Sequence, residues 1–132
     1  MSIPNTPDKP TILIVDDIPA NIDLLKELLR ERYKIKAATS GDKALQIAAR
    51  APTPDLILLD VMMPGMDGYE TCRRLKSDLT TAAIPVLFVT GNGDDGEREK
   101  AQAVGALDLL VKPIDPDSVL ARVAAALARQ PG

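Results

Sequence analysis

The sequence predicts an α/β fold in which five helices cover a five-stranded parallel sheet, a doubly wound arrangement. Five short segments rich in apolar residues alternate with segments whose apolar residues recur at helical spacing. The connections are short, and such alternation favours parallel strands joined by right-handed crossovers. With 132 residues, 45% of them hydrophobic, the chain can bury the core of one domain. We place this domain at 11–128, between a flexible tail at 1–10 and a short tail at 129–132.

Composition excludes several classes of function. The sequence has no histidine, which rules out histidine general bases, histidine metal ligands and Ser-His-Asp triads. A net charge of −3 argues against a nucleic-acid surface, and no apolar run approaches the ~20 residues that cross a bilayer. The single cysteine, Cys72, cannot form an intrachain disulfide, which fits the reducing cytoplasm. We therefore expect a cytoplasmic protein with no direct nucleic-acid or membrane partner.

The first part of the domain contains two predicted strands and two predicted helices. Residues 11–15 are a β-branched apolar run typical of a strand, and Pro19 suits the first turn of the helix that follows. Residues 34–38 alternate weakly and predict a strand nearer the sheet edge. Ser40 then caps a second helix. The residues expected to face inward from these helices are Ile22, Leu25, Leu28, Leu29, Ala44, Leu45, Ala48 and Ala49.

The apolar run at 56–59 has no polar alternation, which is typical of a strand buried on both faces. It ends on Asp60, and the loop beyond contains Pro64, Gly65 and Gly68, residue types that set unusual backbone angles. An acid at the carboxyl end of a buried parallel strand stands where open α/β sheets place their ligand sites. A third helix follows, with inward residues Tyr69, Cys72 and Leu75.

Two further strands, at 86–89 and 107–111, flank a glycine-rich loop at 91–96 and a helix at 97–104. This helix is charged and poorly amphipathic, so we expect it to be the least stable and the most easily moved. The final helix starts after the cap residue Asp115, with inward residues Val119, Leu120, Val123 and Leu127.

Polar residues follow four of the predicted strands: Asp16 with Asp17, Asp60, Thr90 and Lys112. Taken singly, the acids and the threonine have an ordinary explanation as helix caps, and the lysine as a solvated charge. All strands of a parallel sheet end at the same edge, so these side chains should meet there. Four such coincidences are far less expected by chance than one.

The chemistry of this set points to phosphoryl transfer. Three close carboxylates cannot all ionise comfortably without a cation, and a few oxygen ligands suit Mg²⁺ better than zinc. A metal ion and a lysine ammonium would neutralise charge on a phosphoryl group, and a carboxylate can accept that group covalently. The hypothesis is that Asp60 accepts phosphate and Thr90 donates a hydrogen bond to it.

Four motifs make the sequence resemble a response-regulator receiver domain of two-component systems, similar to the single-domain chemotaxis type. They are IVDD at 14–17, LLDVMMPGMDG at 58–68, FVT at 88–90 and VKP at 111–113, and the resemblance covers about residues 11–128. It implies the strand order 2-1-3-4-5. It also implies a signalling domain rather than an enzyme, phosphorylated by a phosphohistidine of a sensor kinase or phosphotransfer protein.

The resemblance also implies roles for individual residues. Mg²⁺ would be held by Asp17, Asp60 and the backbone carbonyl of Met62, with Asp16 acting through water. Thr90 and Lys112 would contact the phosphoryl group on Asp60, and the Lys112–Pro113 peptide bond would be cis. The output would pass to an effector protein or to an effector domain outside this chain. Whether two copies pair as a homodimer stays open.

Two departures from the family pattern leave alternatives. Leu109 stands where the family usually has Tyr or Phe, and Gly91 stands where Ala is common. A degenerate receiver that acts as a phosphate-independent interaction module is therefore the main alternative. A haloacid-dehalogenase-type phosphatase is the enzyme alternative. It would need a second acid two residues after Asp60, where this chain has Met62.

Overall fold

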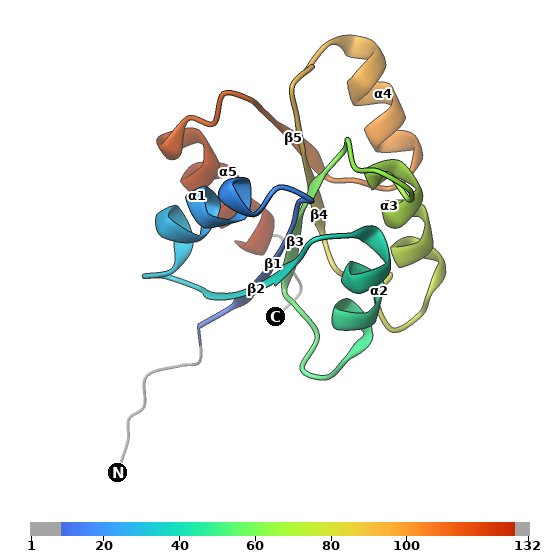
Figure 1. The fold of residues 1–132 in the computed structure, drawn as a ribbon, viewed down its shortest axis with the longest axis horizontal. Helices are drawn as coiled ribbons and strands as arrows, with labels where there is room; N and C mark the ends of the chain where they lie inside the picture. The colour runs from blue at the N-terminus through green and yellow to red at the C-terminus, as the bar shows by residue number, and fades with distance from the viewer. Residues whose placement is uncertain (1–8, 129–132) are drawn as a thin grey trace.

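The computed structural model describes residues 9–128, and these contain one sheet of five parallel strands in the order β2-β1-β3-β4-β5 (Figure 1). Both the predicted fold class and the strand order implied by the resemblance are confirmed. The expected tails, apart from residues 9 and 10, lie outside the described residues. The strands are β1 (Thr11–Val15), β2 (Lys34–Ala38), β3 (Leu56–Asp60), β4 (Val86–Thr90) and β5 (Asp108–Val111).

The helices of the described segment form a layer on each face of the sheet (Figure 1). Side chains of successive strand residues point to opposite faces, so β1 sends Ile12 and Ile14 to one core and Leu13 and Val15 to the other. The first core is covered by α1 and α5, and the second by α2, α3 and α4. The helices are α1 (Pro19–Leu29), α2 (Gly41–Ala49), α3 (Gly68–Ser77), α4 (Asp95–Ala103) and α5 (Pro116–Ala128).

The central strand β3 is buried along its whole length, including Asp60, as the uninterrupted apolar run predicted. Burying four large aliphatic side chains at about 2 kcal/mol each anchors this strand firmly. Its last residue is therefore presented at the edge of the sheet from a rigid support. Six of the residues expected to face inward are less buried than predicted. Ala49 is exposed, and five are only partly buried: Leu28, Leu45, Tyr69, Leu120 and Leu127.

Helix α4 begins at Asp95, two residues before the predicted start. The reason is a side-chain cap, because Asp94 Oδ1 accepts a hydrogen bond from the Glu97 backbone N–H at 2.9 Å. Ala101 is the one residue of this helix that is buried. The helix therefore buries little apolar surface, and its ready movement stays a prediction.

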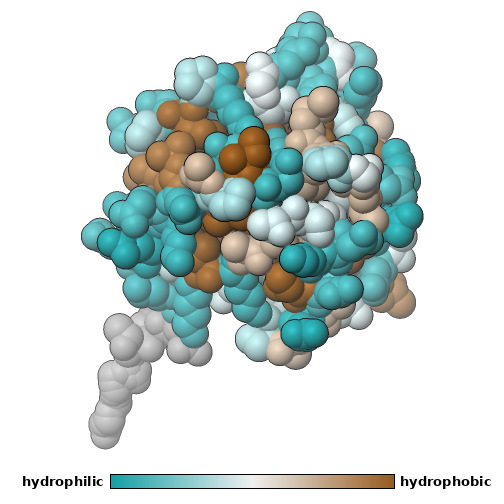
Figure 2. Space-filling view, in the orientation of Figure 1, coloured by the Kyte–Doolittle hydropathy of each residue, from teal (hydrophilic) through white to brown (hydrophobic). Residues whose placement is uncertain are grey.

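The surface in view in Figure 2 is largely hydrophilic, with smaller apolar areas between the charged side chains. None of the helices in the described range is long and apolar enough to cross a membrane.

Candidate functional site

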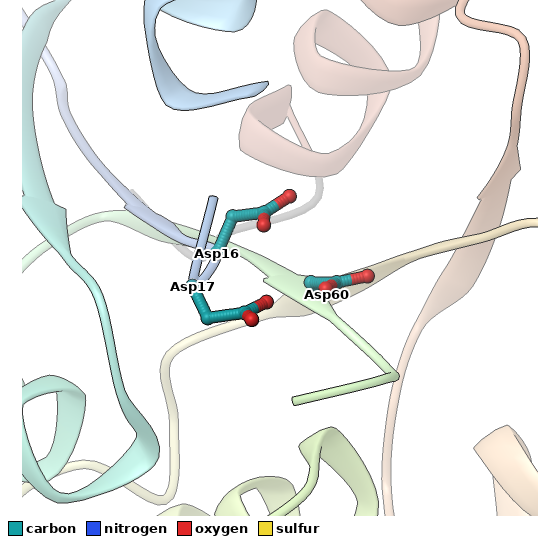
Figure 3. Close-up of side chains that lie close together, drawn as sticks. All are labelled: Asp16, Asp17 and Asp60. Atoms are coloured by element: carbon teal, nitrogen blue, oxygen red, sulfur yellow. The ribbon is translucent and has the colours of Figure 1, made fainter. Parts of the chain in front are cut away.

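Three carboxylates meet at the carboxyl edge of the sheet. Strands β1 and β3 are neighbours with Val15 paired to Leu59, so the residues that follow lie side by side. Asp16, Asp17 and Asp60 each offer an oxygen within 4.8 Å of the others, as Figure 3 shows. Asp16 and Asp60 are buried and Asp17 is partly buried. The sequence prediction that these acids cluster is met by the geometry.

Backbone hydrogen bonds orient Asp16 and close the loop that follows Asp60. The Ile18 N–H donates to Asp16 Oδ1 at 2.9 Å, which holds that carboxylate at the turn into α1. Beyond Asp60, the Gly68 N–H donates to the Val61 carbonyl at 2.9 Å and closes the loop. A Cβ on Gly68 would lie 2.8 Å from Val61 Cα and closer still to the Asp60 carbonyl oxygen. Only glycine lets the start of α3 approach the loop this closely.

The electrostatics of the cluster are unbalanced. Burial raises the pKa of Asp60, and the nearby Asp16 carboxylate raises it further. Lys112 opposes this effect, with its Nζ 3.6 Å from Asp60 Oδ1. The Lys112–Pro113 peptide bond is cis, as predicted. One ammonium does not neutralise three carboxylates, so the cluster favours an additional cation.

The residues present fit Mg²⁺. They offer several carboxylate oxygens within a small space and no nitrogen or sulfur donor among the clustered side chains. Hard cations prefer such ligands, and Mg²⁺ keeps waters where the protein supplies few. Met62, the source of the expected carbonyl ligand, lies two residues beyond Asp60, and this residue is 77% exposed.

Thr90 ends β4 at the same edge, but its hydroxyl is engaged elsewhere. Its Oγ1 donates to Glu97 Oε1 at 3.0 Å, with the Asn92 carbonyl oxygen at 3.3 Å as an alternative acceptor. It also accepts from the Asn92 N–H at 3.2 Å. Sequence reasoning missed Glu97. The Asp94-x-x-Glu97 spacing is typical of the start of a helix. It does not indicate that the Glu97 side chain accepts a hydrogen bond from Thr90 at the end of β4.

Two other sequence expectations can be placed. Leu109 in β5 is only 2% exposed, and it belongs to the core covered by α2, α3 and α4. Cys72 is fully buried, its Sγ donates to the Val104 carbonyl oxygen at 3.3 Å, and burial raises its pKa to about 11. A thiol in that setting is a packing residue rather than a nucleophile, as expected.

A cavity of about 210 Å³ lies beside the carboxylates, between α1 and the connection from β5 to α5. Asp16 and Lys112 form its polar wall, and Leu24, Pro113 and Ile114 contribute apolar surface. The carboxylate cluster can thus be reached from solvent through a cavity with partly apolar walls.

Comparison with known proteins identifies the class. Residues 12–124 match the response regulator receiver domain family, and the chain belongs to it. It is 51% identical to the response regulator PleD of Caulobacter vibrioides over 113 residues, which are 85% of this chain and 25% of PleD. The chain therefore spans about a quarter of the length of that relative. Membership of this family places the domain in two-component signalling.

Solved structures agree with this assignment. A putative response regulator from Chloroflexus aurantiacus is 36% identical, with a TM-score of 0.87 over 92% of this chain and 100% of that one. The receiver domain of the sensor histidine kinase PA1611 from Pseudomonas aeruginosa has a TM-score of 0.82 at 27% identity, over 91% of this chain and 98% of that one. That structure holds a magnesium ion in its active-site cleft.

Proposed function

We propose that this domain accepts a phosphoryl group on Asp60 from a phosphohistidine of a sensor kinase or phosphotransfer protein, in a Mg²⁺-dependent reaction. The observation that carries the proposal is the cluster of Asp16, Asp17 and Asp60 with the Lys112 Nζ 3.6 Å from Asp60. An Asp60 carboxylate oxygen bonds to phosphorus as the bond from phosphorus to the imidazole nitrogen breaks. The donor histidine, protonated on its other ring nitrogen, leaves as neutral imidazole, and no base is needed to activate the Asp60 carboxylate.

Each residue contributes by position and charge. Asp17, Asp60 and the Met62 backbone carbonyl would hold Mg²⁺ directly and Asp16 largely through water, and the ion would neutralise charge on the phosphoryl oxygens. Lys112 places an ammonium beside the same oxygens, within a partly buried site where charge interactions are strong. Thr90 donates its hydroxyl to the phosphoryl group once it has left its present acceptor.

The domain in this proposal acts as a cytoplasmic signalling module rather than as an enzyme that turns over small substrates. Its output passes to an effector protein or an effector domain, and pairing with a second copy is one form that output can take. The alternative, a phosphate-independent interaction module, is favoured by one observation only, which is the buried Leu109 at the usual aromatic position.

The test is phosphorylation with a small phosphodonor and Mg²⁺, followed by intact mass measurement. Wild type and Asp23→Asn, which changes an exposed acid of α1, should both gain one phosphoryl group. Asp60→Asn should gain none, and chelation of the metal should abolish labelling of wild type and Asp23→Asn. A wild-type level of label on Asp60→Asn would remove Asp60 as acceptor, and an unlabelled wild type would favour the phosphate-independent module.

A further inference from the structure

The Thr90 hydroxyl carries a single proton, and its closest acceptor in the described structure is the Glu97 carboxylate at 3.0 Å. Hydrogen bonds to ionised acceptors are stronger than those to carbonyls, so Glu97 outcompetes the Asn92 carbonyl at 3.3 Å. Thr90 itself is buried. In this conformation the proton is therefore withheld from the carboxylate cluster on the neighbouring strand.

Glu97 is free for this contact because its usual partner is taken. In a capping box, the acid at the third helical position bonds back to the N–H of the capping residue. Asp94 caps α4 and Glu97 is that acid, but the Asp94 N–H donates instead to Asn92 Oδ1 at 3.0 Å. Asn92 thus fills the reciprocal half of the box, and the Glu97 side chain turns to the strand end.

A second donor lies close to Glu97. The Tyr69 hydroxyl, on α3, is buried and has no hydrogen-bond partner within the described range. The tyrosine ring is fixed edge-on against Phe88, with centroids 5.3 Å apart and an angle of 77°. Burial raises the pKa of Tyr69, and the neighbouring Glu97 carboxylate raises it further. A buried hydroxyl without a partner is rare and calls for an explanation.

We propose that Glu97 is a positioning residue that exchanges its hydrogen bond between Thr90 and Tyr69. Resting on the proposed function of Asp60, this exchange controls when Thr90 becomes available. In the free domain Glu97 accepts from Thr90, and the nearby Tyr69 hydroxyl makes no hydrogen bond to any of the described residues. When Asp60 is phosphorylated, Thr90 donates to a phosphoryl oxygen, and Glu97 accepts from the Tyr69 hydroxyl.

The exchange conserves hydrogen bonds and moves a defined element. Glu97 keeps one strong donor in each state, while the buried Tyr69 hydroxyl gains its missing acceptor. Because Glu97 lies in the first turn of α4, its change of partner draws that turn from β4 toward α3. The helix has little buried surface to resist this shift. This exchange of hydrogen bonds does not require an aromatic side chain at position 109, where this chain has leucine.

The experiment is a double-mutant cycle on the affinity for beryllofluoride with Mg²⁺, a mimic of the phosphoryl group. Tyr69→Phe keeps the ring and removes only the donor that the bound state uses, so it should weaken binding roughly tenfold. In the background of Glu97→Ala, Tyr69→Phe should have no effect, because its acceptor is gone. The double variant Glu97→Ala with Tyr69→Phe should bind beryllofluoride more tightly than Tyr69→Phe alone, by a similar factor, because Thr90 no longer donates to Glu97.

Matched controls separate this mechanism from a general loss of structure. Glu99→Ala removes the same charge from an exposed position of the same helix and should change neither the affinity nor its coupling to Tyr69. Glu97→Gln keeps an acceptor oxygen and should retain part of the coupling, and it serves the cycle if Glu97→Ala does not fold. The Thr90 methyl resonance of the free protein should shift in Glu97→Ala but not in Tyr69→Phe.

Equal beryllofluoride affinity of wild type and Tyr69→Phe would overturn the exchange while leaving the proposed function in place. An undiminished Tyr69→Phe effect in the Glu97→Ala background would also overturn it. Failure of wild type itself to bind beryllofluoride with Mg²⁺ would overturn both the proposed function and the exchange. An unmoved Thr90 methyl resonance in Glu97→Ala would refute the free-state contact on its own.

Discussion

Removing the charge of Asp60 should stabilise the folded domain when no divalent cation is present. The carboxylate oxygens lie within 4.8 Å of one another; at that separation and an effective dielectric constant near 20, two unit charges repel by about 3.5 kcal/mol, and Asp60 faces two such charges. Lys112, 3.6 Å away, offsets about 4.6 kcal/mol of this repulsion. Solvent screening of the partly exposed Asp17 and Lys112 reduces the remaining destabilisation to about 1 kcal/mol. Asp60→Asn should therefore raise the free energy of unfolding by about 1 kcal/mol at neutral pH.

The stability difference between wild type and Asp60→Asn should depend on pH. The pKa of Asp60 is raised in the folded protein, so the unfolded chain loses that proton at lower pH than the folded one. Wild type therefore loses stability relative to Asp60→Asn as pH rises from 3.8, the ordinary value, through the folded pKa. Below that window both side chains are neutral, and the two proteins should unfold alike.

The assay is thermal unfolding of both proteins in a chelator between pH 3 and pH 8, where 1 kcal/mol corresponds to roughly 3–5 °C. Asp23→Asn is the control for an exposed charge. Added Mg²⁺ should stabilise wild type more than Asp60→Asn, because it binds the folded cluster. If Asp60→Asn melts at or below the wild-type temperature in chelator at pH 7, the repulsion argument is wrong.

Three further predictions concern lifetime, folding and switching. Met62 is exposed near Asp60 and cannot orient a water, so the phosphoryl group on Asp60 should be hydrolysed slowly. Met62→Asn should speed this hydrolysis, and an unchanged rate would show that Met62 does not control it. Gly68→Ala forces a Cβ into the Asp60 and Val61 backbone, so it should cost about 1–3 kcal/mol, which denaturant unfolding measures. Beryllofluoride should shift the resonances of α4 and its preceding loop with little rotamer change at Leu109; a static α4 with a reoriented Leu109 would reverse this.

Sequence patterns located the elements to within a few residues because their causes are local. The period of the apolar residues distinguished strands from helices, and the uninterrupted run before Asp60 required burial on both faces. The start of α4 was predicted late because the cap depends on Asp94 adopting one particular turn. Leu28 and Ala49 lie at helical spacing yet escape full burial, since the width of the covered face depends on how α1 and α2 sit on the sheet.

The sequence alone determined that Asp16, Asp17, Asp60 and Lys112 meet, because parallel strands must all end at one edge. It could not determine where the Thr90 proton goes. That depends on the path of the loop at residues 91–94 between β4 and α4, on the Asp94 N–H donating to Asn92, and on the Glu97 side chain, seven positions along the chain from Thr90. The unsatisfied Tyr69 hydroxyl is likewise a tertiary fact, because only the packing of α3 against Phe88 buries it beside Glu97. Periodicity specifies which face a residue occupies, whereas the choice of a hydrogen-bond partner is decided only once the elements have packed.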